Sequence, residues 1–212
     1  PENCNIYFNL GKSYFMSEQI IQAKEAFNRA IIIDPKHGFS HYFLGQINEN
    51  IMDYDRAIYN YTQALEFNQN IEDIYYRLGM LLYRNKKFKE AMDPLRQFII
   101  LQPDSLNVLK ALGEIFITEN RYSEALDTYK RIDNMYPESL HVNHSIAQSY
   151  LQLKEYENAI NIYKKILLFD DENFETMIKL GNILNDLGEY NEAENSFYEA
   201  LYCSPQNMKI YY

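Results

Sequence analysis

The fold is decided by residues 4–37, CNIYFNLGKSYFMSEQIIQAKEAFNRAIIIDPKH, because the pattern of this stretch returns along the chain. Its glycine, Gly11, has counterparts at intervals of 34 residues or a multiple of 34, at Gly45, Gly79, Gly113 and Gly181, and the skipped place holds Ala147. Its alanine returns without a gap, as Ala23, Ala57, Ala91, Ala125, Ala159 and Ala193. Its proline returns as Pro35, Pro103, Pro137 and Pro205, with Gln69 and Asp171 in the two remaining places. Self-similarity at a fixed period of this length is typical of a solenoid.

Each recurring position has a physical reason. A glycine inside a helix costs about 0.5–1 kcal/mol relative to alanine, so a recurring one needs a compensating gain, usually the close approach of a neighbouring helix. The alanine twelve residues later is expected to lie opposite the glycine. A bulky residue four positions after the alanine, such as Phe27, is expected to fill the space around that contact. The proline ends the second helix. Each repeat is therefore predicted to be a helical hairpin.

The chain resembles the tetratricopeptide-repeat family. Its residues 4–37 match the pattern of that family at Tyr7, Leu10, Gly11, Tyr14, Ala23, Phe27, Ala30 and Pro35. The resemblance implies an all-α fold, a right-handed superhelix of antiparallel helical hairpins. It predicts one array over residues 1–212 with units at 4–37, 38–71, 72–105, 106–139, 140–173 and 174–207. Residues 208–212 would start a further unit, and we expect the chain to be a fragment of a longer array. Three residues depart from the pattern: Ala147, Phe98 and Pro94. Pro94 should remove one backbone hydrogen bond and bend its helix.

Composition narrows the classes of function. The formal net charge is −10, and no run of lysine and arginine follows the chain, which argues against nucleic acid or anionic membrane as the primary partner. The two cysteines, Cys4 and Cys203, lie far apart and do not form a disulfide framework. No apolar run approaches the roughly 18 residues of a membrane span. We expect a soluble, cytoplasmic protein without membrane insertion. Membership of a cytoskeletal or ciliary assembly is compatible with this expectation.

The sequence contains little that points to catalysis. It has no phosphate-binding glycine loop, no nucleophile elbow, no His-Glu-x-x-His and no paired CxxC. His141 and His144 are spaced three apart with Glu175 in the matching place of the next unit, a set that could ligate a transition metal. Isolated helical histidines are far more often structural, so we expect no metal site. The interpretation is that the chain is not an enzyme and needs no cofactor.

The resemblance instead implies a binding surface, because the first helices of such repeats line a concave groove that holds a partner's peptide or helix. On that face we predict a partner-binding site formed by Phe8, Lys12, Phe15, Tyr42, Gln46, Tyr76, Met80, Tyr83, Arg84, Lys110 and Glu114. The tyrosines are expected to keep their hydroxyl groups in water while their rings hold an apolar or aromatic segment. The alternative for Phe8, Phe15 and Phe39 is that they complete the core. Some members of the family clamp the C-terminal carboxylate of a chaperone with lysine, asparagine and further basic residues. We do not expect this clamp here, since only Arg77 fits its pattern.

The predicted function is therefore that of a non-catalytic scaffold for a protein or peptide partner. Two alternatives stay open. The chain could be the substrate-recruiting arm of an enzyme whose catalytic domain lies outside these residues. It could also be an architectural subunit of a large assembly, such as a ciliary transport or cell-cycle complex, with self-association or stacking on other repeat proteins.

Overall fold

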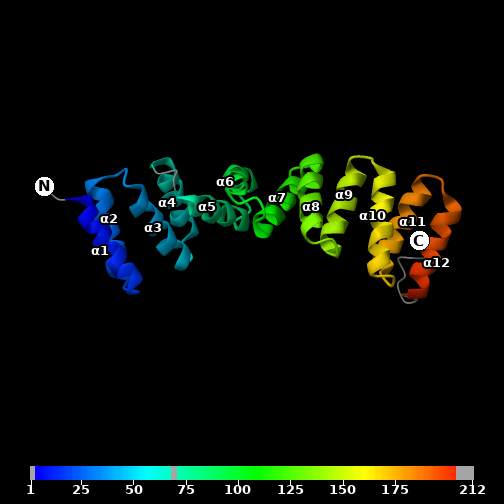
Figure 1. Ribbon diagram of the computed structural model, residues 1–212, viewed down its shortest axis with the longest axis horizontal. Helices are drawn as coiled ribbons and strands as arrows, with labels where there is room; N and C mark the ends of the chain where they lie inside the picture. The colour runs from blue at the N-terminus through cyan, green and yellow to red at the C-terminus, as the bar shows by residue number, and fades with distance from the viewer. Residues whose placement is uncertain (1–2, 68–70, 204–212) are drawn as a thin grey trace. The chain divides into compact units, whose positions relative to one another are not determined.

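The computed structural model describes residues 3–67 and 71–203, and within them it is entirely helical, without a strand. Twelve helices follow one another in the described chain (Figure 1): α1 Cys4–Met16, α2 Ile20–Ile33, α3 Gly38–Asn50, α4 Tyr54–Phe67, α5 Glu72–Arg84, α6 Phe88–Leu101, α7 Leu106–Thr118, α8 Tyr122–Met135, α9 Leu140–Gln152, α10 Tyr156–Phe169, α11 Phe174–Asp186 and α12 Tyr190–Cys203. The all-α fold of successive helical hairpins is confirmed. Gln69, Pro205 and the predicted start of a further unit at 208–212 lie outside the described residues.

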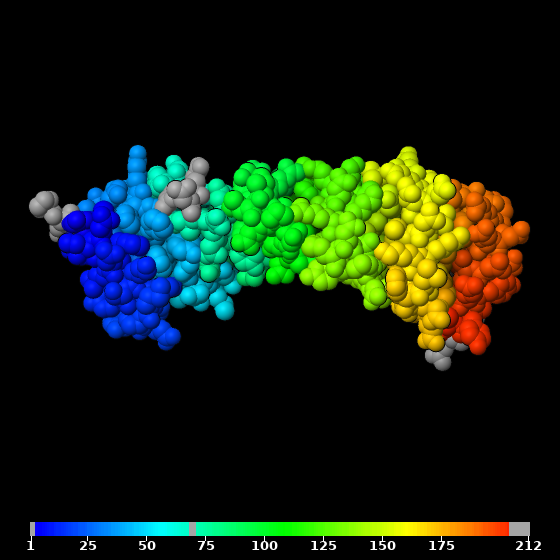
Figure 2. Space-filling model, in the orientation of Figure 1, coloured from blue at the N-terminus to red at the C-terminus, as the bar shows by residue number. Residues whose placement is uncertain are grey.

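The helices group into two compact units, one up to Val108 and one from Leu109 onward, with the boundary inside α7. In the first unit each helix contacts its neighbour in the chain, from α1 with α2 to α5 with α6. In the second unit the same order holds from α8 with α9 to α11 with α12. The space-filling view shows the hairpins of each unit succeeding one another in chain order (Figure 2). Each hairpin thus has its partners next to it in the sequence. That all six predicted repeats form one array stays a prediction.

Each of the recurring glycines lets one large side chain of the second helix approach closely. A Cβ atom added at Gly45 would lie 2.6 Å from the ring of Tyr61, and one at Gly113 would lie 2.7 Å from the ring of Tyr129. The nearest residue is always sixteen positions after the glycine, which is the bulky residue four positions after the alanine that was expected to fill this space. That the alanine itself lies opposite the glycine stays a prediction. The alanines are fully or almost fully buried beside this contact.

The turn inside every hairpin has the same backbone conformation. After α1, the amide of Glu18 donates to the carbonyl of Phe15 and the amide of Gln19 donates to that of Tyr14, which is the Schellman arrangement. The residue at the place of Glu18 has a positive φ, between 58° and 62°, in five hairpins: Glu18, Met52, Lys86, Asn120 and Lys154. The sixth turn has Gly188, with φ 82°. Five of these turns therefore use a side-chain-bearing residue where glycine is the usual choice.

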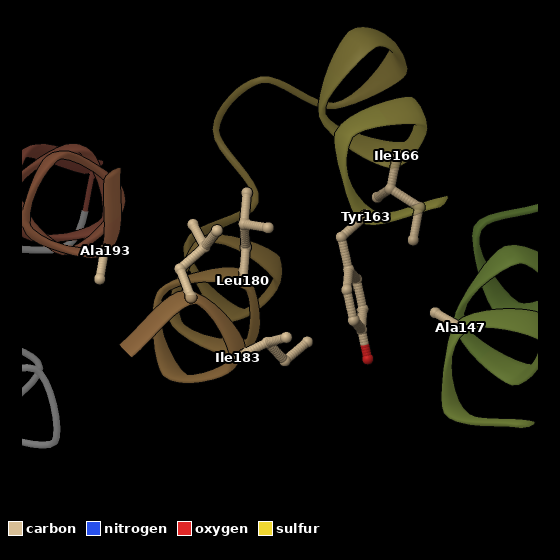
Figure 3. Packing of buried hydrophobic residues seen from close by; sticks show 7 residues of the cluster. Ala147, Tyr163, Ile166, Leu180, Ile183 and Ala193 are labelled. Atoms are coloured by element: carbon tan, nitrogen blue, oxygen red, sulfur yellow. The ribbon is translucent and has the colours of Figure 1, made fainter. Parts of the chain in front are cut away.

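The departures from the pattern are accommodated inside regular helices. Pro94 lies within α6, which continues through it from Phe88 to Leu101. Phe98 is 7% exposed and its ring packs on Tyr76 at 5.2 Å between centroids. Ala147 shares a core cluster with Tyr163, Leu180 and Ile183, so the Cβ atom at this place is tolerated in the second unit (Figure 3). Whether Pro94 bends α6 stays a prediction.

Candidate functional site

The predicted partner-binding residues divide between the two units. Phe8, Lys12 and Phe15 lie on α1, Tyr42 and Gln46 on α3, and Tyr76, Met80, Tyr83 and Arg84 on α5, all in the first unit. Lys110 and Glu114 lie on α7 in the second unit, and both are exposed. In the first unit, Lys12 and Arg84 are exposed and the other seven are half-buried. The candidate site is therefore the face that α1, α3 and α5 share in the first unit, which we call the first-helix face.

At one end of this face the phenylalanines form an aromatic cluster. The ring of Phe8 lies 5.0 Å from that of His37 and 5.9 Å from that of Phe43 between centroids, and Phe15 meets Phe43 edge-on at 5.3 Å. Phe27 stacks on Phe43 with an interplanar angle of 10°. Phe8 and Phe15 pack against the core of the first two hairpins, so for them the core-completing alternative holds. Phe39, in contrast, leaves 45% of its surface exposed.

In the middle of the face a polar network ties three helices together. The Tyr42 hydroxyl on α3 donates to Asp73 Oδ2 on α5 at 2.5 Å. Arg77 Nε donates to the same oxygen, and Arg77 also reaches Glu49 Oε2 on α3 at 3.3 Å. On α4, the Tyr61 hydroxyl donates to Glu49 Oε2 at 2.6 Å. The Tyr42 hydroxyl is thus bound to a carboxylate of the next repeat, and that the tyrosine hydroxyl groups stay in water remains a prediction.

The network fixes the charge state of its members. Burial and the hydrogen bond to Asp73 raise the pKa of Tyr42 to about 12, which keeps this phenol neutral and donating. Burial disfavours the charge on Arg77, but the hydrogen bond to Asp73 and the electrostatic attraction of Tyr61, Asp73 and Tyr42 together outweigh it, so the pKa of Arg77 is raised. Two carboxylates therefore face one permanently charged guanidinium. Because Arg77 is already paired, it is not available to clamp the carboxylate of a partner.

Next to the network the surface is hollowed. A cavity of about 480 Å³ is lined by Glu72, Asp73, Tyr76, Phe98, Gln102, Ser105 and Asn107. The ring of Tyr76 rests on that of Phe98, so one wall is aromatic, while Glu72 and Asp73 make another wall acidic. Among the predicted site residues only Tyr76 lines this cavity. A side chain with an apolar stem and a positive tip would match both walls.

Sequence reasoning missed most of the residues that build this site. Asp73, Glu49 and Tyr61 join three helices, and the positions of Asp73 and Arg77 four residues apart on one helix are a recognisable signal for an ion pair. No pattern of neighbouring residues predicts the hydrogen bonds of Tyr42 and Glu49, because their partners lie 31 and 12 residues away in the sequence. Phe43 joins Phe8, Phe15 and Phe27, and its role follows only from the packing of α3 on α2.

Of the two histidines of the second unit singled out in the sequence, His141 is exposed and His144 is half-buried. His144 Nε2 lies 3.3 Å from the Thr176 hydroxyl, and its Nδ1 is buried without a partner among the described residues. Burial and the neighbouring Lys179 lower the pKa of His144. In residues 3–67 and 71–203 no three His, Cys, Asp or Glu side chains gather as metal ligands would. Cys4 and Cys203 are free thiols.

None of the described helices combines the length and the apolar character needed to cross a membrane.

Comparison with known proteins identifies the class of repeat. Family models of the tetratricopeptide repeat match residues 4–37, 140–173 and 175–204. The family model described as anaphase-promoting complex, cyclosome, subunit 3 matches residues 50–132. The chain therefore belongs to the tetratricopeptide-repeat proteins. This fold is that of a protein-interaction scaffold, and such repeats are typically non-catalytic.

Individual relatives are distant. Superkiller protein 3 of Schizosaccharomyces pombe is 27% identical over 117 residues, which cover 52% of this chain but only 8% of that protein. Among solved structures, YrrB, described as a repeat protein with an unusual peptide-binding site, is 16% identical with a TM-score of 0.66, covering 89% of this chain and 97% of its own. MamA is 20% identical with a TM-score of 0.65, covering 81% and 94%. At these identities the structures show the fold alone.

Proposed function

We propose that the first-helix face of the first unit binds an extended peptide or a helix of a partner protein. The observation that carries this proposal is the cavity on that face, with Tyr76 and Phe98 on one wall and Glu72 and Asp73 on another. Aromatic residues anchored in such a hollow are the usual centres of binding energy. Met80 and Arg84, one and two turns further along α5, extend the contact surface.

The polar network favours a binding surface that is preformed in the absence of the partner. Three hydrogen bonds of the network hold α3, α4 and α5 to one another, and a fourth joins Arg77 to Asp73 within α5. A fixed surface loses little conformational entropy on binding, so the cost of ordering falls on the partner. The expected motif is a lysine or arginine next to an apolar or aromatic side chain, because the carboxylate of Glu72 remains beside the aromatic wall.

A selection from a display library of random peptides tests this proposal. The chain should enrich peptides with a basic residue next to an aromatic one, and these peptides should bind Tyr76→Ala at least about tenfold more weakly. Gln97→Ala, an exposed position on α6, is the matched control and should bind like the parent. Enrichment of acidic peptides, or equal binding by Tyr76→Ala, would contradict the proposal.

A second function, that of a subunit in a multi-protein assembly, is favoured by the match of residues 50–132 to the anaphase-promoting-complex family model. Size-exclusion chromatography of a cell lysate separates the two. A subunit should elute at the size of a large complex even after Tyr76→Ala, whereas a scaffold for peptides should lose its partners with that variant. Elution at the size of the free chain would contradict the assembly function.

A further inference from the structure

The tip of the third hairpin, between α5 and α6, concentrates positive charge. Residues 84–89 contain no acidic side chain and four basic ones, Arg84, Lys86, Lys87 and Lys89, which we call the basic tip. They belong to a chain whose formal net charge is −10. All four side chains are exposed. The basic tip is therefore a local positive surface on an acidic protein.

The repeat itself does not require these basic residues. Three of the four places are exposed in all six hairpins: the last residue of the first helix, the left-handed residue of the turn and the second residue of the second helix. At these three places the other five hairpins have a single basic side chain, Lys154. Because the places are exposed in every hairpin, packing does not select the residue type there. The concentration of charge is thus specific to the third hairpin.

Helix electrostatics accounts for Arg84 but not for the lysines. Arg84 lies in the last turn of α5, where a positive charge is favourable. Lys87 is the N-cap of α6 and Lys89 lies in its first turn, where a positive charge is unfavourable. Lys87 pairs weakly with Asp55 at 3.8 Å, and Arg84, Lys86 and Lys89 form no ion pair within the part of the chain that the structure describes. The lysines thus act against the stability of α6, which is typical of residues that serve binding.

The backbone that carries these cations is held in place. The amide of Lys86 donates to the carbonyl of Tyr83 and the amide of Lys87 donates to that of Leu82, both at 2.9 Å. The rings of Tyr83 and Phe88 pack on each other at 6.0 Å between centroids, which joins the end of α5 to the start of α6. A partner therefore meets a tip whose backbone needs no further ordering.

The basic tip lies at the opposite end of α5 from the acidic wall of the cavity. Glu72 and Asp73 are in the first turn of α5, and Arg84 is in the last. Between them, Tyr76, Met80 and Arg84 follow at intervals of four residues, so they share one side of the helix. The twelve positions from Glu72 to Arg84 span about 18 Å of helix. An extended peptide covers this length in about five or six residues.

We propose that the partner segment is extended and carries both charges, with its basic and aromatic pair in the cavity and acidic side chains on the basic tip. The acidic side chains then lie about five or six positions from the pair. This inference rests on the proposed function, because it adds a second contact to the same peptide. A peptide bound in the reverse direction would place its acidic residues against Glu72 and Asp73, so the charges also fix its direction.

The same arrangement disfavours other anionic partners. A nucleic acid or an anionic membrane surface carries one sign of charge throughout. It would be attracted by the basic tip and repelled by Glu72 and Asp73 at the other end of α5. A protein segment, in contrast, can present a positive charge at one end and a negative charge at the other.

A selection from a display library of random peptides, made in parallel on the parent and on Lys86→Glu/Lys89→Glu, tests this inference. Peptides enriched by the parent should contain the basic and aromatic pair and, about five or six positions to one constant side, an excess of Asp and Glu. The double variant should still enrich the pair, but its peptides should lose the acidic residues or carry basic ones there. Arg84 is unchanged in this variant, so the first-helix face stays intact.

Fluorescence anisotropy with one enriched peptide measures the size of the effect. Replacing its acidic residues by the corresponding amides should weaken binding to the parent about two- to fivefold, because exposed ion pairs contribute modestly. The same replacement should leave binding to the double variant unchanged. Lys154→Glu, at the matching turn of the fifth hairpin, is the matched control and should behave like the parent.

The double variant should fold like the parent, because glutamate already occupies the two places in other hairpins, as Glu18 and Glu157. Its urea midpoint should be unchanged or raised, since an acidic residue is favourable in the first turn of α6. A lowered midpoint would show that the lysines support the fold and would overturn the inference.

The outcomes of the selection separate this inference from the proposed function. Peptides with the pair but without acidic residues, or the same acidic residues with the double variant, would overturn the inference and leave the proposed function intact. Absence of the pair from the peptides of the parent would overturn both.

Discussion

At the residue scale, one contact recurs in both units, between a small residue of the first helix and a large one of the second. Phe27, Tyr61, Leu95, Tyr129 and Phe197 all lie directly over a glycine. Tyr61 combines this contact with a hydrogen bond to Glu49, so the same side chain supports the hairpin and the polar network of the candidate site. The glycine at Gly45 therefore also positions a residue of the candidate site's polar network.

Gly45→Ala tests this contact. The added Cβ atom would lie 2.6 Å from the fully buried Tyr61 ring, so the ring must move, and its hydrogen bond to Glu49 must move with it. We expect a loss of about 1–3 kcal/mol in the free energy of unfolding, as measured by urea titration. Asn50→Ala, at an exposed position of the same helix, should change it by less than about 0.5 kcal/mol. Equal effects of the two variants would disprove the contact's role.

His144 makes the stability of the second unit depend on pH. Burial and Lys179 lower its pKa below the ordinary histidine value of 6.5, so the unfolded chain binds the proton more readily than the folded chain. The contribution of neutral His144 is complete above pH 6.5 and is lost as the pH falls through the lower, folded-state pKa. Urea midpoints at about pH 7.5 and about pH 5.5 should differ more for the parent than for His144→Gln. An identical loss in both proteins would assign the effect to other groups.

At the element scale, the hairpin turns contain a backbone conformation that the sequence pattern does not predict. The helices and their 34-residue spacing follow from glycine, alanine and proline, and the structure confirms the hairpins. The left-handed residue in most turns could not be predicted, because Glu18, Met52, Lys86 and Lys154 share no side-chain chemistry and only Gly188 and Asn120 are typical signals. The Schellman hydrogen bonds, not the residue type, impose this conformation.

Met52→Gly tests the strain in these turns. Met52 has φ 61° and is 73% exposed, so its side chain contributes little packing. We expect the free energy of unfolding to rise by about 0.5–1 kcal/mol, because glycine adopts the left-handed region without a clash at Cβ. Met52→Ala keeps the Cβ atom and should leave the urea midpoint near that of the parent. A stabilisation by alanine as large as that by glycine would show that removal of the methionine side chain is the cause.

At the scale of the whole molecule, the candidate site was only partly predictable. The pattern of first helices identified Tyr76, Met80 and Arg84 on α5, and Tyr76 does line the cavity. Tyr42 was expected to keep its hydroxyl group in water while its ring held a partner, and the structure shows that this hydroxyl donates to Asp73 of the next repeat. Such bonds between repeats depend on the packing of one hairpin on another, which no local pattern in one sequence contains. Binding by the predicted residues stays a prediction.

The measurement that tests the partner-binding face most directly is quantitative affinity capture with mass spectrometry, comparing the parent with a Tyr76→Ala/Met80→Ala double variant. Both changed residues are half-buried on α5 and outside the polar network, so the fold should be retained. Thr62→Ala/Gln97→Ala, at exposed positions on α4 and α6, is the matched control. The account predicts that one set of proteins is captured by the parent and the control and lost with the double variant. Capture of the same proteins by all three would contradict it and would place recognition on another surface of the chain.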